Sequence, residues 1–329
     1  MKKIVLSIVS LLLLGIGTGC SDYLDIVPEG VPSMDNAFSN RANSEKFLAT
    51  CYSYLPSFQD PGKTVGFMTG DEFWTIPKDV ATRMSNSGWE IGRGSQNSNT
   101  PYMNYWDGGG DDYGGHNLWI GIRDCNIFLE NIHKPLDLED YERTRWIAEI
   151  TFLKAYYHFY LMQLYGPIPI VDKNIEVNAS IEEVRRYREP FDDCVNYVVG
   201  LLDNCMDDLP LIIESPALEM GRITRPIAAA VKAQVLLFAA SPLMNGNPDY
   251  VNIKDNRGVS IFSQEFDMGK WSKAAEAAQD AILIAESAGH ALYQFQEVFN
   301  ISETTRTILS INEAVTARWN NEIIWGATS

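Results

Sequence analysis

The sequence is poor in basic residues: 26 Lys and Arg stand against 43 Asp and Glu, which gives the 329 residues a formal charge of −17. So acidic a chain repels the phosphate backbone of nucleic acids, and no basic stripe compensates for this repulsion. Nucleic acid is therefore excluded as a predicted partner. The hydrophobic fraction of 46% is nevertheless ample for a packed core.

The sequence also lacks the short motifs that mark common catalytic and phosphate-binding sites. It contains no G-x-x-x-x-G-K-[S/T] loop, so the triple glycine at residues 108–110 does not indicate a phosphate site. The H-E-x-x-H and G-x-S-x-G patterns are absent as well. Because a carboxylate pair for glycoside hydrolysis cannot be recognised from spacing alone, a glycosidase stays open as an alternative.

Clusters of metal-binding residues are missing too. No C-x-x-C pattern occurs, so zinc is not expected, and buried free thiols are predicted at four cysteines: Cys51, Cys125, Cys194 and Cys205. His158 lies in an apolar helical stretch, where a hydrogen-bonded structural histidine is expected rather than a ligand. Asp107, Asp111 and Asp112 lack the ligand order of an EF-hand, which favours a solvated loop over a calcium site. We predict no metal and no cofactor.

The amino terminus has the features of an export signal. Lys2 and Lys3 precede an uncharged apolar run at residues 4–16, which is too short to cross a bilayer. Small residues at 17–19 then lead into Cys20. We interpret residues 1–19 as a lipoprotein signal peptide and Cys20 as the acylated residue that anchors the mature chain in a membrane. The alternative is an ordinary secretory peptide followed by a chance cysteine.

The rest of the sequence predicts a mostly α fold. Apolar residues recur at helical spacing in six segments: 43–55, 118–132, 142–164, 191–209, 225–241 and 271–287. The third is apolar on most sides, which is typical of a helix buried between others. In the last segment the spacing places Trp271, Ala274, Ala278, Ile282 and Ala285 on one side. Small alanines facing aromatic side chains suggest a scaffold of tetratricopeptide-like helix pairs.

Residues 56–117 form the exception, because they are rich in Gly, Asn, Ser, Asp and aromatic residues and have no helical period. So long an irregular stretch inside a compact protein is usually functional. Aromatic platforms surrounded by amide, acid and guanidinium groups suit sugar rings, which combine an apolar face with a hydroxyl rim. The alternative is that the rings pin the loop onto the helices. The candidate glycan-binding residues are Trp74, Trp89, Arg93, Asn104, Tyr105 and Trp106.

Four blocks together resemble the SusD/RagB family of outer-membrane nutrient-binding lipoproteins. They are CSDYLDIVP (20–28), AEITFLKAYYHFYLMQLYGPIPIV (148–171), GRITRPIAAAVKAQVLLFAASPLMNG (221–246) and KWSKAAEAAQDAI (270–282). The resemblance makes residues 20–329 a SusD-like helical domain with tetratricopeptide-like pairs. It also implies a surface-exposed, lipid-anchored protein of the outer membrane that captures oligosaccharides without catalysis. Such a protein delivers them to a TonB-dependent SusC-like transporter.

The end of the sequence, NNEIIWGATS (320–329), resembles a stretch that lies in the middle of family members. We therefore expect the chain to lack a C-terminal part. The leading hypothesis is non-catalytic glycan binding. The alternatives are a lipid-anchored α-helical glycoside hydrolase or lyase, and a helix-repeat scaffold that binds a protein partner without glycan.

Overall fold

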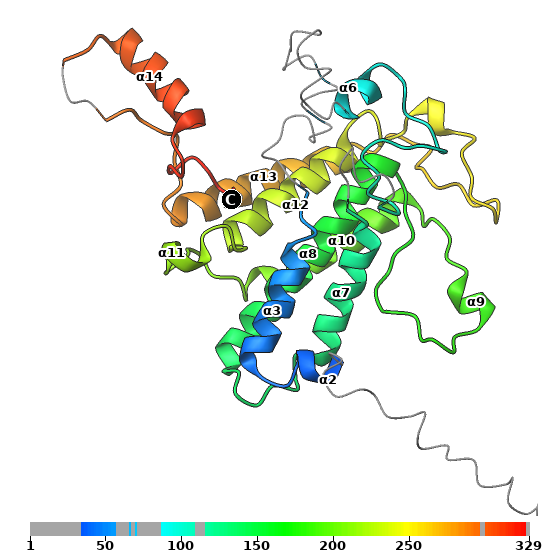
Figure 1. Ribbon diagram of the computed structural model, residues 1–329. Helices are drawn as coiled ribbons and strands as arrows, with labels where there is room; N and C mark the ends of the chain where they lie inside the picture. The colour runs from blue at the N-terminus through cyan, green and yellow to red at the C-terminus, as the bar shows by residue number, and fades with distance from the viewer. Residues whose placement is uncertain are drawn as a thin grey trace, which may run out of the picture.

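The computed structural model describes residues 34–56, 66, 70, 87–108, 116–296 and 300–326 (Figure 1). The predicted signal peptide, Cys20, Trp74, Asp111 and Asp112 lie outside these residues. The backbone of residues 87–89 is described, but their side chains are not. Within the described ranges no helix is long and apolar enough to span a membrane.

The described part of the chain is helical, as the sequence predicts, and contains no strand beyond one isolated bridge between Lys254 and Ser260. The six predicted helices are all present, with ends that differ by a few residues. They are α3 (Arg41–Tyr52), α7 (Leu118–Asn131), α8 (Asp140–Tyr165), α10 (Phe191–Met206), α12 (Arg225–Ala240) and α13 (Met268–Ser287).

Further helices were not anticipated from the sequence. Most are short connecting elements: α2 (Met34–Ala37), α6 (Ser87–Gly92), α9 (Ile181–Val184), α11 (Pro216–Glu219) and the 3-10 helix η4 (Pro248–Tyr250). The longest of them is α14 (Glu303–Thr316), which contains no buried residue. Helix α6 lies inside the stretch predicted to be irregular, so that prediction is wrong for residues 87–92.

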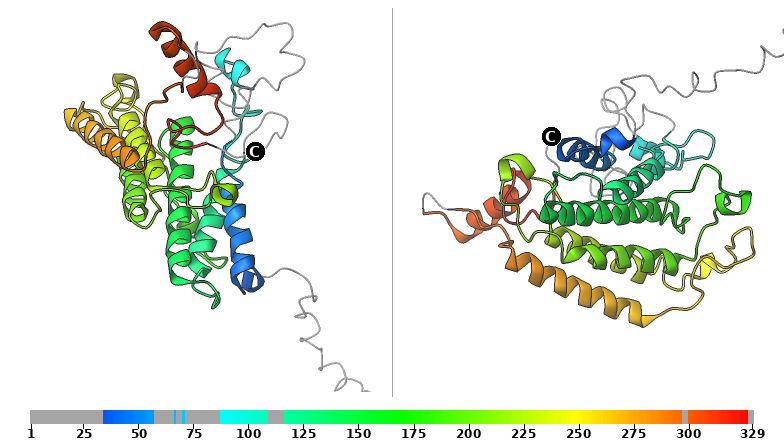
Figure 2. Two further views of the ribbon diagram at one scale, coloured as in Figure 1. Left: turned by 90° about the vertical axis from the view of Figure 1, so that its left-hand side faces the viewer. Right: turned by 90° about the horizontal axis from the view of Figure 1, so that it is seen from below.

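The helices pack in successive layers that follow the chain. Helix α7 lies against α8, α8 against α10, α10 against α12 and α12 against α13, while α3 covers α7 and α8. Figure 2 shows α8, α12 and α13 side by side in its right-hand view. Neighbouring helices run as hairpin-like pairs, which agrees with the predicted helix-pair scaffold.

The buried face of α13 differs from the prediction. Trp271 and Ile282 were expected on the packed side, but they are 38% and 52% exposed. The packed side consists of four alanines instead: Ala274, Ala277, Ala281 and Ala285. Their small side chains let the backbones of α12 and α13 approach closely, and α12 also contributes buried alanines. Close packing of small residues therefore outweighs the burial of the larger side chains.

Helix α8 lies at the centre of the core. Its side chains are buried around most of its circumference, including Trp146, Phe152, Tyr157 and Phe159. The helix ends where Gly166 adopts a φ of 70°, a left-handed conformation that a residue with a Cβ enters only at a cost. Gly166 donates its backbone N–H to the carbonyl of Met162, at 2.9 Å.

His158 is the buried structural histidine that the sequence predicts. Its Nδ1 lies 2.7 Å from the carbonyl oxygen of Lys154, and its Nε2 accepts the backbone N–H of Val171 at 3.3 Å. These partners require a neutral ring with the proton on Nδ1. Burial lowers the pKa of His158 to about 4, because the charged imidazolium loses its hydration. The four predicted thiols are likewise free and buried.

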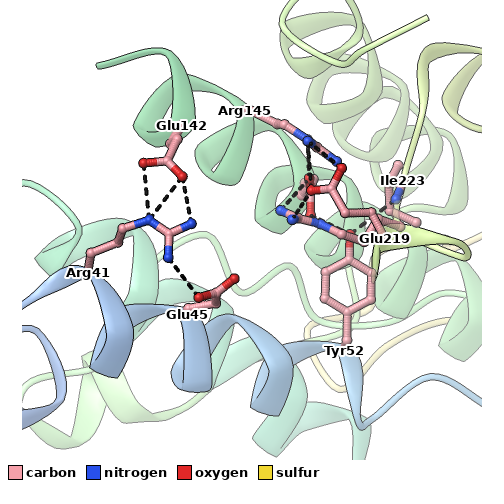
Figure 3. A network of polar contacts seen from close by, with 9 residues as sticks. Arg41, Glu45, Tyr52, Glu142, Arg145, Glu219 and Ile223 are labelled. Carbon is pink, nitrogen blue, oxygen red and sulfur yellow. Dashed lines mark hydrogen bonds and ion pairs between the residues drawn. The ribbon is translucent and has the colours of Figure 1, made fainter. Parts of the chain in front are cut away.

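A buried carboxylate joins α8 to two other parts of the chain (Figure 3). Glu149 has no solvent exposure and accepts a hydrogen bond from the hydroxyl of Tyr52 on α3, at 2.6 Å. Arg145 contacts it from one turn earlier at 2.9 Å, and Arg222, which precedes α12, contacts it at 2.9 and 3.1 Å. Glu219 in turn pairs with both arginines. The network therefore fixes α3 and the segment before α12 against α8.

We predict that Glu149→Ala lowers the free energy of unfolding by about 3–5 kcal/mol, because it removes the fully buried one of the two carboxylates that Arg145 and Arg222 share. Urea denaturation measures this loss. Glu45→Ala is the matched control, since Glu45 also pairs with an arginine but is 48% exposed, and its removal should cost less than about 1 kcal/mol. Equal losses in the two variants would contradict the importance assigned to the network.

The lowered pKa of His158 predicts a dependence of stability on pH. Unfolded histidine binds a proton near its ordinary pKa of about 6.5, whereas the folded ring stays neutral until about pH 4. Acidification through this window therefore favours the unfolded state. Between pH 7 and pH 5 the loss from this group should reach about 2 kcal/mol.

This pH dependence is measured by denaturation of the wild type and of His158→Gln at both pH values. The variant has no titrating ring, so its stability should fall less between pH 7 and pH 5. His133→Gln removes an exposed histidine and serves as the control. A variant whose stability falls as much as that of the wild type would rule out His158 as the source.

Candidate functional site

The candidate site is a cavity of about 900 Å³ at one end of the helical layers. Three parts of the chain that are distant in the sequence form its walls: the loop at residues 96–107, the end of α8 together with Pro169 and residues 186–188, and the loop at residues 253–261. Figures 1 and 2 show these segments at the end of the helices where α6 and α9 lie. The cavity combines aromatic rings, amide side chains and charged groups.

Trp106 provides an indole ring to this cavity and is held by two neighbouring aromatic side chains. Its ring meets that of Trp119 on α7 edge to face, with centroids 5.1 Å apart, and that of Tyr165 at 5.2 Å. Such T-shaped pairs stabilise the ring beyond the burial of its area. The ring remains only half-buried. Trp106 is therefore an anchored platform with part of its surface open to the cavity.

Asn104 shapes the loop that presents this ring. Its side-chain oxygen accepts the backbone N–H groups of Trp106 and Asp107, both at 3.2 Å, and its amide nitrogen donates to the Asp107 carboxylate. The residue lines the cavity but is 5% exposed. Asn104 thus positions Trp106 mainly through the backbone of the loop.

Tyr165, the last residue of α8, connects the same loop to the core. Its hydroxyl oxygen accepts the backbone N–H of Tyr105 at 3.1 Å. Burial raises the pKa of this hydroxyl, so Tyr165 stays protonated at neutral pH. The loop is also tied to the start of α7, because Leu118 donates its N–H to the carbonyl of Tyr105 at 3.1 Å. Trp106 therefore occupies a fixed position relative to α7 and α8.

The other predicted site residues lie elsewhere. Tyr105 is 2% exposed and packs edge to face on Tyr160 of α8, so its ring belongs to the core and does not line the cavity. Arg93 is exposed, pairs with Glu90 of α6 at 3.2 Å and is not among the cavity residues. Trp89 lies in α6, and its side chain, like Trp74, is outside the described residues. The cavity brings together Asn104 and Trp106 from the predicted set.

Several residues of the cavity were missed by sequence reasoning: Tyr165, Arg186, Tyr187, Arg188 and Lys254. One signal was available, since the run R-R-Y-R at residues 185–188 is a local basic cluster in an acidic chain. The other cavity residues meet only because segments that are far apart in the sequence pack together. No local sequence pattern therefore predicts them.

The opposite wall of the cavity is a stacked and ion-paired unit. The guanidinium of Arg257 lies over the ring of Tyr187, 4.5 Å from its centroid, and its Nε contacts the Asp255 carboxylate at 2.5 Å. Desolvation acts to raise the pKa of Asp255, but hydrogen bonds from Arg257 and the backbone of Val259 outweigh it and lower the pKa. Asp255 therefore stays ionised.

Chemically, the cavity can hold a ligand that has both apolar faces and hydrogen-bonding edges. Trp106 and Tyr187 supply aromatic surface, and Asn256 supplies an amide that both donates and accepts. The amide of Asn97 is engaged within its own loop, with Ser95 and Thr100. Among the described residues no group of three or more His, Cys, Asp or Glu is placed to hold a metal ion. The cavity therefore has the features of a binding site for a small polar ligand.

Comparison with solved structures shows that this architecture is shared. The chain is similar to the protein BT4246, with 28% sequence identity and a TM-score of 0.71 over 88% of this chain and 51% of that one. It also has the fold of a SusD-like protein, BF3747, from Bacteroides fragilis, with 18% identity and a TM-score of 0.55 over 80% and 42% of the two chains. The chain thus spans about half the length of these structures. No curated protein matches it.

The sequence itself matches a family profile over residues 22–237, which is well over half of the chain. The family is the SusD-like family described as starch-binding and associating with the outer membrane. The helical fold, the two structural likenesses and this match agree with one another. The chain belongs to the SusD-like family.

Proposed function

We propose that this protein binds oligosaccharides at the cavity around Trp106 and that it does so without catalysis. The observation that supports this proposal most strongly is the anchored, half-open indole of Trp106 in a cavity of about 900 Å³. Membership of a family described as starch-binding supports the same conclusion.

The chemistry of a sugar matches this arrangement. A pyranose ring has a face of C–H groups that packs on an aromatic ring and a rim of hydroxyls that both donate and accept hydrogen bonds. Trp106 offers the flat surface, and Asn256 offers an amide on another wall of the cavity. A fixed platform loses little conformational entropy when the ligand binds, which favours affinity.

We further propose that the protein is anchored at the outer membrane by lipid on Cys20 and delivers glycan to a TonB-dependent SusC-like transporter. The family description, which places its members at the outer membrane, supports the location. The apolar run at residues 4–16 followed by Cys20 supports the anchor. Two or more acyl chains hold a protein stably at a bilayer, whereas one chain holds it only marginally.

The proposed site predicts the effect of removing the platform. Trp106→Ala should weaken oligosaccharide binding by about 1–3 kcal/mol, because the sugar loses its aromatic contact. Isothermal titration against host, plant and microbial oligosaccharides measures this change. Trp271→Ala is the control, since Trp271 lies on α13 away from the cavity and is 38% exposed. Unchanged affinity in the Trp106 variant would remove this ring from the site.

The proposed anchor predicts where the protein is found in the cell. Cys20→Ala removes the thiol that receives lipid, so the protein should leave the membrane fraction and appear in the soluble fraction. Fractionation and surface labelling of intact cells measure the change, and Ser21→Ala serves as the neighbouring control. Full retention of the Cys20 variant on the cell exterior would refute the anchor.

A further inference from the structure

The cavity around Trp106 differs from the rest of this acidic chain in its charge. Arg186, Arg188 and Lys254 all line it, and all three are exposed. Among the described residues none of the three forms an ion pair, although sixteen ion pairs occur elsewhere in that part of the protein. The Arg188 guanidinium donates a hydrogen bond to the backbone carbonyl of Tyr165, which holds it at the rim.

The carboxylates near the cavity offset only part of this positive charge. Asp255 is matched by Arg257 at 2.5 Å and also accepts backbone N–H groups at 2.8 and 2.9 Å. Glu189, beside the cavity, pairs with Arg257 at 3.5 Å. Asp107 lines the cavity and keeps its negative charge, because the hydrogen bond that it accepts comes from the neutral amide of Asn104. With Arg257 included, four cations stand against three carboxylates in and beside the cavity, so a net positive charge remains. Outside the cavity, Arg186 also interacts electrostatically with Glu183 of α9, but the two side chains do not form an ion pair.

We infer that the cavity selects an acidic oligosaccharide, one whose sugar ring packs on Trp106 while its carboxylate or sulfate oxygens face Arg188, Arg186 and Lys254. This inference rests on the proposed function and specifies its ligand class. A guanidinium fork binds two oxygens of a carboxylate or sulfate at once, and an ammonium adds a point charge. A chain with a formal charge of −17 would otherwise repel such a ligand, so the local cations are what allows an anion to approach.

The first test compares each acidic oligosaccharide with its own neutral form. Oligogalacturonides are titrated beside the same oligosaccharides after carboxyl reduction. Chondroitin sulfate oligosaccharides are titrated beside a desulfated form, a carboxyl-reduced form and a form that has undergone both treatments and is neutral. At least one acidic ligand should bind about 10-fold more tightly than its neutral partner, and the difference should shrink as salt is added. The reduced and desulfated arms distinguish a carboxylate from a sulfate as the recognised group.

The second test removes the charges of Arg186 and Lys254, which form no ion pair among the described residues. The double variant Arg186→Gln/Lys254→Gln should bind the acidic and neutral forms with similar affinity, because the acidic form loses the charged groups that it alone requires. The control Lys46→Gln/Lys273→Gln changes the net charge equally at exposed positions on α3 and α13. It should keep the full preference. Circular dichroism confirms that both variants are folded.

The outcomes separate this inference from the proposed function. Equal binding of acidic and neutral partners by the wild type, or an unchanged preference in the double variant, overturns the acidic ligand and leaves sugar binding intact. If the protein binds only neutral oligosaccharides, the acidic ligand is likewise overturned and sugar binding stands. Absence of binding to every acidic and neutral oligosaccharide overturns both. Trp106→Ala provides the cross-check, because it should weaken the acidic and neutral forms alike.

Discussion

The burial of α8 is the constraint on which the rest of the structure depends. A helix whose side chains are apolar around most of its circumference is stable only when other elements enclose it. Helices α7 and α10 flank it, α3 covers it, and Trp325 near the end of the described chain packs on Phe152 and Tyr156. The polar groups that this burial traps, Glu149 and His158, are satisfied by partners on other segments. These hydrogen bonds fix the positions of the neighbouring segments relative to α8.

The binding cavity follows from where α8 ends. Tyr165 is its last residue, and this side chain both packs on Trp106 and accepts a hydrogen bond from the loop that presents it. The loop is thus attached directly to the most buried helix. The scaffold is therefore more than a support: its central helix sets the position of the ring on which a sugar can pack.

The sequence predicted the helices well because their apolar periods are long and Gly and Pro mark their ends. It also named Trp106 and Asn104, which line the cavity, because so many aromatic side chains in a loop are unusual. It could not distinguish Trp106 from its neighbour Tyr105, because adjacent loop residues point in opposite directions that only tertiary packing decides. For the same reason the contribution of Tyr165, which reaches the cavity from the end of α8, left no local signal.

The central claim is that the end of α8 and the loop at residues 103–108 place Trp106 where a sugar ring binds. The most direct measurement is a crystal structure of the protein with the tightest-binding oligosaccharide found by titration. The account predicts a sugar ring packed on the indole of Trp106, between the walls formed by residues 186–188 and 253–256. A bound oligosaccharide that leaves this cavity empty and contacts another face of the molecule would contradict it.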